Sequence, residues 1–217
     1  MQNNMSNAKQ IALMGMFSAI IFLLAFTPLG FINLGFMRAT TIHIPVIIGA
    51  IFLGPKYGAA LGFLFGFSSF LIATLTPVPS SFVFSPFVPV PGVGSGSPWA
   101  LFVAFVPRVF VGIVPYYVYK GLKKITSKNK RLDVLTLTIT GLAGSLTNTL
   151  LVLHSIFIFF GEPWTTIVNG SPADAVYAVI VGIIATAGVP EAIVAGLLVA
   201  AVGSALNVVL RNKAQAA

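Results

Sequence analysis

Long apolar stretches, separated by short polar or basic segments, run along almost the whole chain. A helix needs roughly 20 apolar residues to cross a bilayer, because the hydrocarbon core is about 30 Å thick and each residue adds about 1.5 Å. Six stretches meet or approach this length, at residues 8–26, 39–53, 57–75, 98–119, 133–160 and 173–210. The pattern predicts an all-α integral membrane protein in which residues 1–217 form one domain, a six-transmembrane-helix bundle.

Charged residues are rare and are distributed unevenly between the gaps that separate these stretches. The formal net charge of +8 could suit nucleic acid, but the basic residues lie between apolar stretches rather than on a polar domain. With the N-terminus inside the cell, the outer gaps hold only Arg38, Glu162 and Asp174. The inner gaps hold Lys9, Lys56, Lys120, Lys123, Lys124, Lys128, Lys130, Arg131, Arg211 and Lys213. Because basic residues favour the cytoplasmic side, both termini are predicted inside and the long segment 76–98 outside, as an extracellular loop between helices three and four.

Two of the six stretches are irregular. Residues 39–53 are short for a crossing and contain a proline, whereas residues 173–210 are too long for a single crossing. A seventh crossing would place Arg211 and Lys213 outside the cell, against the charge bias. We therefore expect one long last helix, kinked near Pro190, whose first turns protrude outward.

Composition restricts the chemistry that this chain can perform. Hydrophobic residues make up 57% of the chain and charged residues 7%, which leaves too little polar surface to coat a soluble globule. There is no cysteine, and two histidines with four carboxylates offer few ligands for a metal centre. The sequence contains no phosphate-binding loop, so the chain has no means of its own to use ATP. We expect a protein of the cell membrane that holds no metal or cofactor and is not an enzyme.

Arg108 is the most informative polar residue, because it lies near the middle of the fourth apolar stretch. A charge at that depth costs at least about 2.5 to 3.5 kcal/mol, so such residues usually face a cavity or a partner. A guanidinium can hold the carboxylate of a ligand through two parallel hydrogen bonds. The structural alternatives are an internal ion pair with Glu191 and hydrogen bonds to the backbone.

Three further polar residues are candidates for the same site. Asn148 should face the protein interior, where its amide binds a ligand or hydrogen-bonds another helix, because it would stay unpaired in lipid. His154 lies six residues further out, and its role is a packed, interfacial or ligand-contacting one. Glu191 follows the expected kink and contacts the ligand, pairs with Arg108 or anchors the kink through backbone amides.

The outer segment 76–98 is rich in proline, serine, glycine and phenylalanine. Loops of this length without a helical pattern are usually functional or disordered. Its phenylalanines favour a lid packed over an apolar cavity, in preference to a mobile surface loop. The candidate ligand contacts in this segment are Phe82, Phe84 and Ser85. Trp99, at the outer end of the fourth stretch, is a further candidate.

Small residues recur on one face of the first stretch. They are Ala8, Ala12, Gly15 and Ala19. Small side chains let another helix approach closely in a membrane. This small-residue stripe predicts either a docking face for a partner protein or close packing inside the bundle.

Several segments resemble the substrate-specific S components of energy-coupling factor (ECF) vitamin transporters, over essentially the whole chain. The second and third stretches carry ATIHIPVIIGAIFLGPKYGAALG, the outer loop SFVFSPF, and the last three stretches VPRVFVGIVPY, TNTLLVL and VPEAIVA. The resemblance implies a subunit that binds a vitamin outside and delivers it with a transmembrane coupling protein (T component) and two cytoplasmic ATPases. The small-residue stripe would then touch the coupling protein, and Arg108, Asn148 and residues 82–86 would line the pocket.

The pantothenate-specific members show the closest resemblance, and the residues suit this ligand. Pantothenate carries one carboxylate with hydroxyls and an amide, which matches a single mid-membrane arginine with an amide and serines nearby. Folate, riboflavin and a pyridoxine-like precursor stay open, and Arg38 could supply a second cation for folate. Two other classes are an intramembrane enzyme using His154, His43 and a serine, and a ligand-free accessory protein stabilised by an Arg108–Glu191 pair.

Overall fold

The helices of the protein follow the hydropathy pattern. The computed structural model describes residues 6–33, 38–126, 130–168 and 176–215. In chain order the elements are α1 (Asn7–Ala25), β1 (Phe31–Asn33), β2 (Arg38–Thr40), α2 (His43–Leu53), α3 (Pro55–Leu75), the 3₁₀ helix η2 (Pro79–Val83), α4 (Trp99–Thr126), α5 (Lys130–Val168), α6 (Val176–Ile183), the π-helix η4 (Ile184–Gly188) and α7 (Val189–Gln215). Lys128, Asp174 and the first residues of the last predicted stretch, 173–175, lie outside the described residues.

Five candidate membrane spans occur in the described part of the chain, each long and apolar enough to cross a bilayer. They cover Asn7–Ala25, Pro55–Leu75, Trp99–Thr126, Leu132–Trp164 and Tyr177–Val209. A sixth apolar helix, α2, has 11 residues and is too short to cross a bilayer by itself. The chain is therefore helical with five to six apolar candidate spans, as expected for a membrane protein.

The short helix α2 forms the centre of the bundle. All of its residues are buried, including the polar His43. It contacts α1, α3, α4, α5 and α7, so protein side chains surround it on every face. A helix that is apolar all round belongs in such a position, because any solvent-facing side would expose apolar surface.

The segment before α2 forms a strand rather than a helix. Strand β1 pairs antiparallel with β2, so the prediction of a helix from residue 39 is wrong, and α2 begins four residues later. The hydroxyl of Thr40 accepts a hydrogen bond from the backbone N–H of Ile42 at 3.2 Å, and that of Thr41 donates to the carbonyl of Leu29 at 2.6 Å. Such local side-chain bonds to the backbone compete with helix formation.

The last stretch continues from α6 through η4 into α7, and its predicted irregularity near Pro190 is confirmed. A proline has no N–H, so the carbonyl four residues earlier, that of Thr186, loses its helical partner. One π-helical turn, η4, lies immediately before this point. Such turns are frequent at functional sites within helices.

Glycines allow α3 and α4 to pack with their backbones almost in contact. A Cβ atom added to Gly58 would lie 2.0 Å from the carbonyl oxygen of Gly112, and one added to Gly62 would lie 2.1 Å from that of Arg108. No side chain fits at these positions unless the two helices separate. The close crossing therefore fixes the height at which α4 presents Arg108 to the interior.

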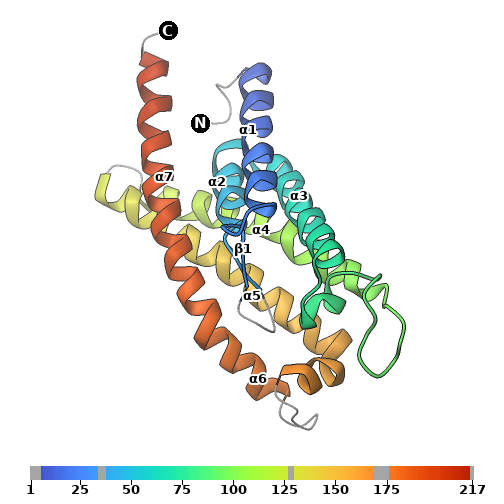
Figure 1. The fold of residues 1–217 in the computed structure, drawn as a ribbon. Coiled ribbons are helices and arrows are strands. Elements are labelled where there is room, and N and C mark those ends of the chain that lie inside the picture. Colours follow the sequence, from blue (N-terminus) through green and yellow to red (C-terminus); the bar gives the residue numbers. More distant parts are fainter. Residues whose placement is uncertain (1–5, 34–37, 127–129, 169–175, 216–217) are drawn as a thin grey trace.

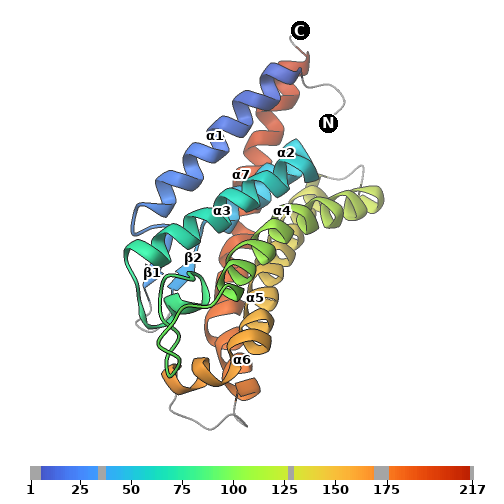
Figure 2. The ribbon, with the colours of Figure 1, turned by 90° about the vertical axis from the view of Figure 1, so that its right-hand side faces the viewer.

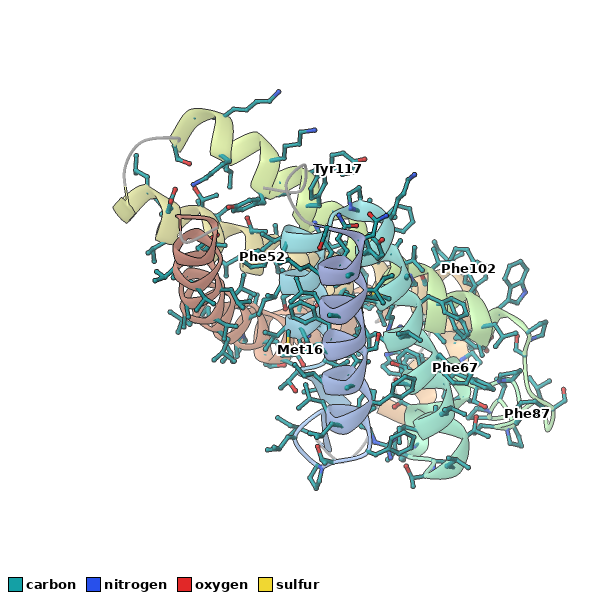
Figure 3. The ribbon with its side chains drawn as sticks, turned by 90° about the horizontal axis from the view of Figure 1, so that it is seen from above. Met16, Phe52, Phe67, Phe87, Phe102 and Tyr117 are labelled. Atoms are coloured by element: carbon teal, nitrogen blue, oxygen red, sulfur yellow. The ribbon has the colours of Figure 1, made fainter. Side chains whose placement is uncertain are left out.

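The start of α1 and the end of α7 lie at one end of the molecule (Figures 1 and 2). The β1–β2 hairpin, the loop between α3 and α4, and α6 lie at the other end. Apolar side chains such as Phe67, Phe87 and Phe102 are exposed along the edge formed by α3, α4 and their connecting loop (Figure 3). A helix bundle with apolar side chains on its outside suits a lipid environment.

Replacing Gly112 by alanine should destabilise the protein, because its Cβ would lie 1.9 Å from the carbonyl oxygen of Gly58. Overpacking of this kind costs about 1 to 3 kcal/mol. The matched control is Gly121→Ala on the same helix, where a Cβ meets nothing within 4 Å. Thermal melting of the purified protein in detergent should place Gly112→Ala below the wild type and Gly121→Ala at or slightly above it. Equal melting temperatures for the two variants would contradict the close crossing.

Candidate binding pocket around Arg108

Arg108 is buried inside α4, with 4% of its surface exposed. Its Nη1 atom donates a hydrogen bond to the backbone carbonyl of Val103 at 2.5 Å. The guanidinium carbon lies 5.4 Å from the centroid of the Phe65 ring and 4.7 Å from that of the Phe84 ring. Cation–π contacts contribute roughly 0.5 to 2 kcal/mol each, so the two rings replace part of the lost hydration. The Nε atom has no hydrogen-bond partner in the described part of the chain.

Glu191 does not neutralise Arg108, although both residues line the same cavity. Within the described residues, no carboxylate lies within ion-pair distance of this guanidinium. The Oε1 atom of Glu191 instead accepts a hydrogen bond from the backbone N–H of Thr40 at 2.8 Å, which ties β2 to α7. The ion pair considered from the sequence is therefore not formed. Glu191 does bind a backbone amide, but that amide belongs to the hairpin rather than to the kink.

The cavity beside Arg108 has a volume of about 60 Å³ and is enclosed by segments far apart in the chain. The lining residues are Arg38, Ala39, Thr40, Phe84, Arg108, Asn148, Thr149, Val152, Leu153, Ile156, Trp164, Ile183, Ala187, Gly188 and Glu191. A second cavity of about 40 Å³ adjoins it and shares Arg38, Thr40, Phe84 and Arg108. A third, apolar cavity of about 280 Å³ lies against Thr40 and Glu191 as well, so their hydrogen bond forms part of the wall between it and the first.

Three residues that line the first cavity each carry a buried polar atom that lacks a partner in the described part of the chain. These atoms are the donors Arg108 Nε and Trp164 Nε1 and the acceptor Asn148 Oδ1. Trp164 is 1% exposed and Asn148 6%. A buried polar atom without a partner costs about 1 to 3 kcal/mol. A cavity lined by residues with such donors and such an acceptor is suited to a small polar ligand that supplies the missing hydrogen bonds.

Trp164 lies beyond the predicted end of the fifth helix, which is why the hydropathy pattern missed it. The helix α5 continues to Val168, but the backbone at Phe160 leaves the helical region, with φ −139° and ψ 19°. Pro163 lies inside the helix shortly after this kink, and a proline removes a helical hydrogen bond. The kink redirects the last turns of α5, and Trp164 lines the cavity. A tryptophan next to a proline at a helix end was the signal available in the sequence.

Arg38 and Ser69 also line the cavities, although the sequence pointed only to Arg38, as a second cation for folate. The Nη2 atom of Arg38 donates to the backbone carbonyl and, at 3.2 Å, to the hydroxyl of Thr76 at the end of α3. Partial burial lowers the pKa of Arg38 from its usual value. The hydroxyl of Ser69 is buried without a partner among the described residues and adjoins the second cavity. Hydropathy does not single out Ser69, because it is one small polar residue within a long apolar helix.

Phe84 joins Arg108, Asn148 and Glu191 at the first cavity, whereas Phe82 and Ser85 pack behind it. The Phe82 ring is fully buried, with its centroid 5.7 Å from that of Phe160 and 6.4 Å from that of Trp164. Phe82 therefore packs against Trp164, which lines the cavity, but does not line the cavity itself. The Ser85 hydroxyl is 2.7 Å from the hydroxyl of Thr74 and accepts from the backbone N–H of Phe87 at 3.2 Å. The 3₁₀ helix η2 and the residues after it thus pack over the interior.

His154 and Trp99 lie away from the cavity. His154 is on the exposed side of α5, and its Nδ1 atom is 2.7 Å from the carbonyl oxygen of Leu150. Trp99 is half exposed at the start of α4, and its ring stacks on that of Phe159 with 4.4 Å between centroids. Neither residue lines any of the three cavities.

The small-residue stripe of α1 faces away from the bundle. Its four members are Ala8, Ala12, Gly15 and Ala19, and all of them are exposed. The opposite face of α1 packs through Phe17, Ile21 and Ala25. A Cβ atom added to Gly15 would meet nothing within 4 Å. The stripe is therefore available to another helix and does not serve close packing inside this chain.

Comparison with known proteins places this arrangement in a family. The family model described as the ECF transporter substrate-specific component matches residues 9–203. The chain belongs to this family. It is a multi-pass protein of the bacterial cell membrane and, as an S component, a part of a transporter rather than an enzyme.

Two curated relatives match this S component over nearly their full lengths. The pantothenic acid transporter PanT of Lactococcus lactis subsp. cremoris is 40% identical over 211 residues, which cover 95% of this chain and 98% of the relative. The pantothenate transporter PanT of Leuconostoc mesenteroides subsp. mesenteroides is 30% identical over 211 residues, with 95% of each chain covered.

Trp164→Phe should lower the melting temperature of the ligand-free S component only through the smaller volume of the buried ring, because Trp164 Nε1 has no hydrogen bond to lose. Ser85→Ala should lower it, since the variant removes the hydrogen bonds of the Ser85 hydroxyl with Thr74 and with the backbone N–H of Phe87, each worth about 0.5 to 1.5 kcal/mol. Thermal melting in detergent without ligand compares the two. A loss for Trp164→Phe several times larger than that for Ser85→Ala would show that Trp164 serves mainly stability.

Proposed function

We propose that this S component binds pantothenate at the outer face of the membrane and delivers it inward with an energising module. The observation that carries the proposal is the buried guanidinium of Arg108, which adjoins a cavity and has no carboxylate partner among the described residues. Its Nε atom is unpaired, so a ligand carboxylate could bind there through charge-assisted hydrogen bonds. The two pantothenate-transporting relatives support this choice of vitamin.

The other polar groups of pantothenate match the remaining atoms of the cavity. Its hydroxyls and amide both donate and accept hydrogen bonds. A ligand must donate to Asn148 Oδ1 and accept from Trp164 Nε1, so these groups fit both. Arg38, the second arginine at the cavity, already donates to Thr76. One guanidinium with a free donor fits a ligand with one carboxylate better than folate, which has two.

The cavity must widen to admit a vitamin. Its volume of about 60 Å³ is well below the roughly 300 to 1,000 Å³ of typical ligand pockets. The hairpin is held to α3 by the contact of Arg38 with Thr76, and to α7 by the hydrogen bond of Thr40 with Glu191. We propose that these contacts release when the ligand enters, and that the outer segment 76–98 covers it.

The proposed topology is a single domain of six crossings, with both termini in the cytoplasm and the segment 76–98 outside. The charge bias between the gaps supports it, because basic residues favour the cytoplasmic side. The start of α1 and the end of α7 lie at one end of the bundle, which agrees with an even number of crossings (Figures 1 and 2). The cavity, bounded by β2 and α6, then opens toward the outer side.

We propose that a transmembrane coupling protein docks on the small-residue stripe of α1 and that two cytoplasmic ATPases supply the energy. The stripe is exposed along the helix and lies opposite the packed face of α1. Exposed small residues suit a helix–helix contact in lipid, because the backbones approach closely. This division of labour leaves ligand capture to the present chain and ATP hydrolysis to its partners.

Purified protein should bind radiolabelled pantothenate without ATP, and unlabelled folate, riboflavin and pyridoxine should not displace it. Arg108→Ala should weaken binding at least about tenfold, because a hydrogen bond to a charged group is worth about 1.5 to 3 kcal/mol. Trp164→Phe should weaken it by several fold, and Trp99→Phe, the matched control outside the cavity, should not change it. Failure to bind any vitamin would reject the proposal, and displacement by folate alone would correct the substrate.

Ala12→Trp should abolish pantothenate uptake by cells while leaving binding by the isolated protein intact, because the bulky ring would block the docking face. The matched control is Ile20→Trp, which adds a similar ring at an exposed position of α1 outside the stripe. Loss of both uptake and binding in Ala12→Trp would assign the stripe to folding.

A further inference from the structure

Pro107 lies between Val103 and Arg108 in α4, and Arg108 donates a hydrogen bond to the Val103 carbonyl. In an α-helix the N–H of residue 107 would donate to the carbonyl of residue 103. Pro107 lies inside α4 and has no N–H, so this carbonyl loses its helical partner. Val103 is fully buried, which keeps water from replacing the missing donor. The Nη1 atom of Arg108 donates to this carbonyl at 2.5 Å.

Arg108 is well placed to replace the missing donor to the Val103 carbonyl, because of the direction in which side chains point on a helix. Side chains on a helix point toward its N-terminus, so a long side chain at 108 passes back over the preceding turn. The rings of Phe65 and Phe84 then hold the guanidinium at 5.4 and 4.7 Å from their centroids. The orphaned carbonyl and the two rings together restrict the position of a side chain that is otherwise long and flexible.

The bond to Val103 also selects which donors of the guanidinium remain available. A guanidinium is a planar fork with five N–H donors, and a carboxylate binds it best through two parallel hydrogen bonds. Because Nη1 is used by the backbone, the opposite edge, formed by Nε and Nη2, is left for a ligand. The Nε atom has no partner among the described residues, as this assignment requires.

We propose that Pro107 is a positioning residue for the ligand carboxylate. By removing one backbone donor it creates the carbonyl that anchors Nη1 of Arg108, and it thereby aims the Nε edge at the bound anion. This inference rests on the proposed function, since it assumes that a carboxylate ligand occupies the cavity beside Arg108.

The test compares Pro107→Ala with wild-type protein for two ligands, pantothenate and pantothenol, in which an alcohol replaces the carboxylate. An alanine at 107 restores an N–H for the Val103 carbonyl and weakens the anchor. Affinity for pantothenate should fall about tenfold, as expected for one charged hydrogen bond lost or misdirected. Affinity for pantothenol, measured by displacement of labelled pantothenate, should stay unchanged because it has no carboxylate to aim.

The matched control is Pro115→Ala, the same change at the other proline inside α4. Pro115 lies eight residues away, about 12 Å along the helix axis. Any effect of straightening the helix should appear in both variants and change both ligands alike. Only Pro107→Ala should reduce the preference for pantothenate over pantothenol.

A second background keeps the test decisive if pantothenol binds too weakly to measure. Arg108→Lys retains the charge but has no planar fork, so adding Pro107→Ala to it should cause no further loss of pantothenate affinity. Equal losses for both ligands, no loss in Pro107→Ala, or a full further loss in the Arg108→Lys background would overturn the positioning role. Wild-type protein that binds no pantothenate would instead refute the proposed function on which the inference rests.

Discussion

A positive charge buried without an opposite charge is the constraint that organises this protein. The guanidinium of Arg108 is almost wholly removed from solvent, and in the described part of the chain no carboxylate pairs with it. The protein offsets the lost hydration only in part, through one backbone carbonyl and the faces of two aromatic rings. Arg108 keeps an unpaired donor and lines a cavity, which suits the binding of an anion.

The surrounding architecture holds that charge at a defined place. Glycine contacts bring the backbones of α3 and α4 together, which sets Phe65 beside Arg108. The 3₁₀ helix η2 leads into Phe84, whose ring also contacts the guanidinium, and the kink of α5 brings in Trp164. The hairpin bridges α3 and α7 above the cavity through Arg38 and Thr40. No single segment forms the pocket around Arg108, which exists only where these segments meet.

Particular residues show where sequence reasoning succeeded and where it stopped. Arg108 was recognisable because a charge inside an apolar stretch is rare and energetically costly. Asn148 was recognisable because an amide there is also costly, though less so than a charge. Thr40 was assigned to a helix, because hydropathy does not register the side-chain bonds that favour a strand there. Trp164 was missed because an aromatic residue beyond an expected helix end looks like any interfacial tryptophan.

The sequence by itself determined the membrane class, the apolar spans, the irregularity near Pro190 and the family resemblance. These features depend on the order and hydropathy of neighbouring residues, so the local sequence pattern is enough to predict them. Only the tertiary structure decided that Glu191 binds the amide of Thr40 rather than Arg108, and that Asn148 and Trp164 leave polar atoms unpaired in one cavity. Such pairings depend on how distant helices pack, because a hydrogen bond forms or fails over a few tenths of an ångström that no local pattern encodes.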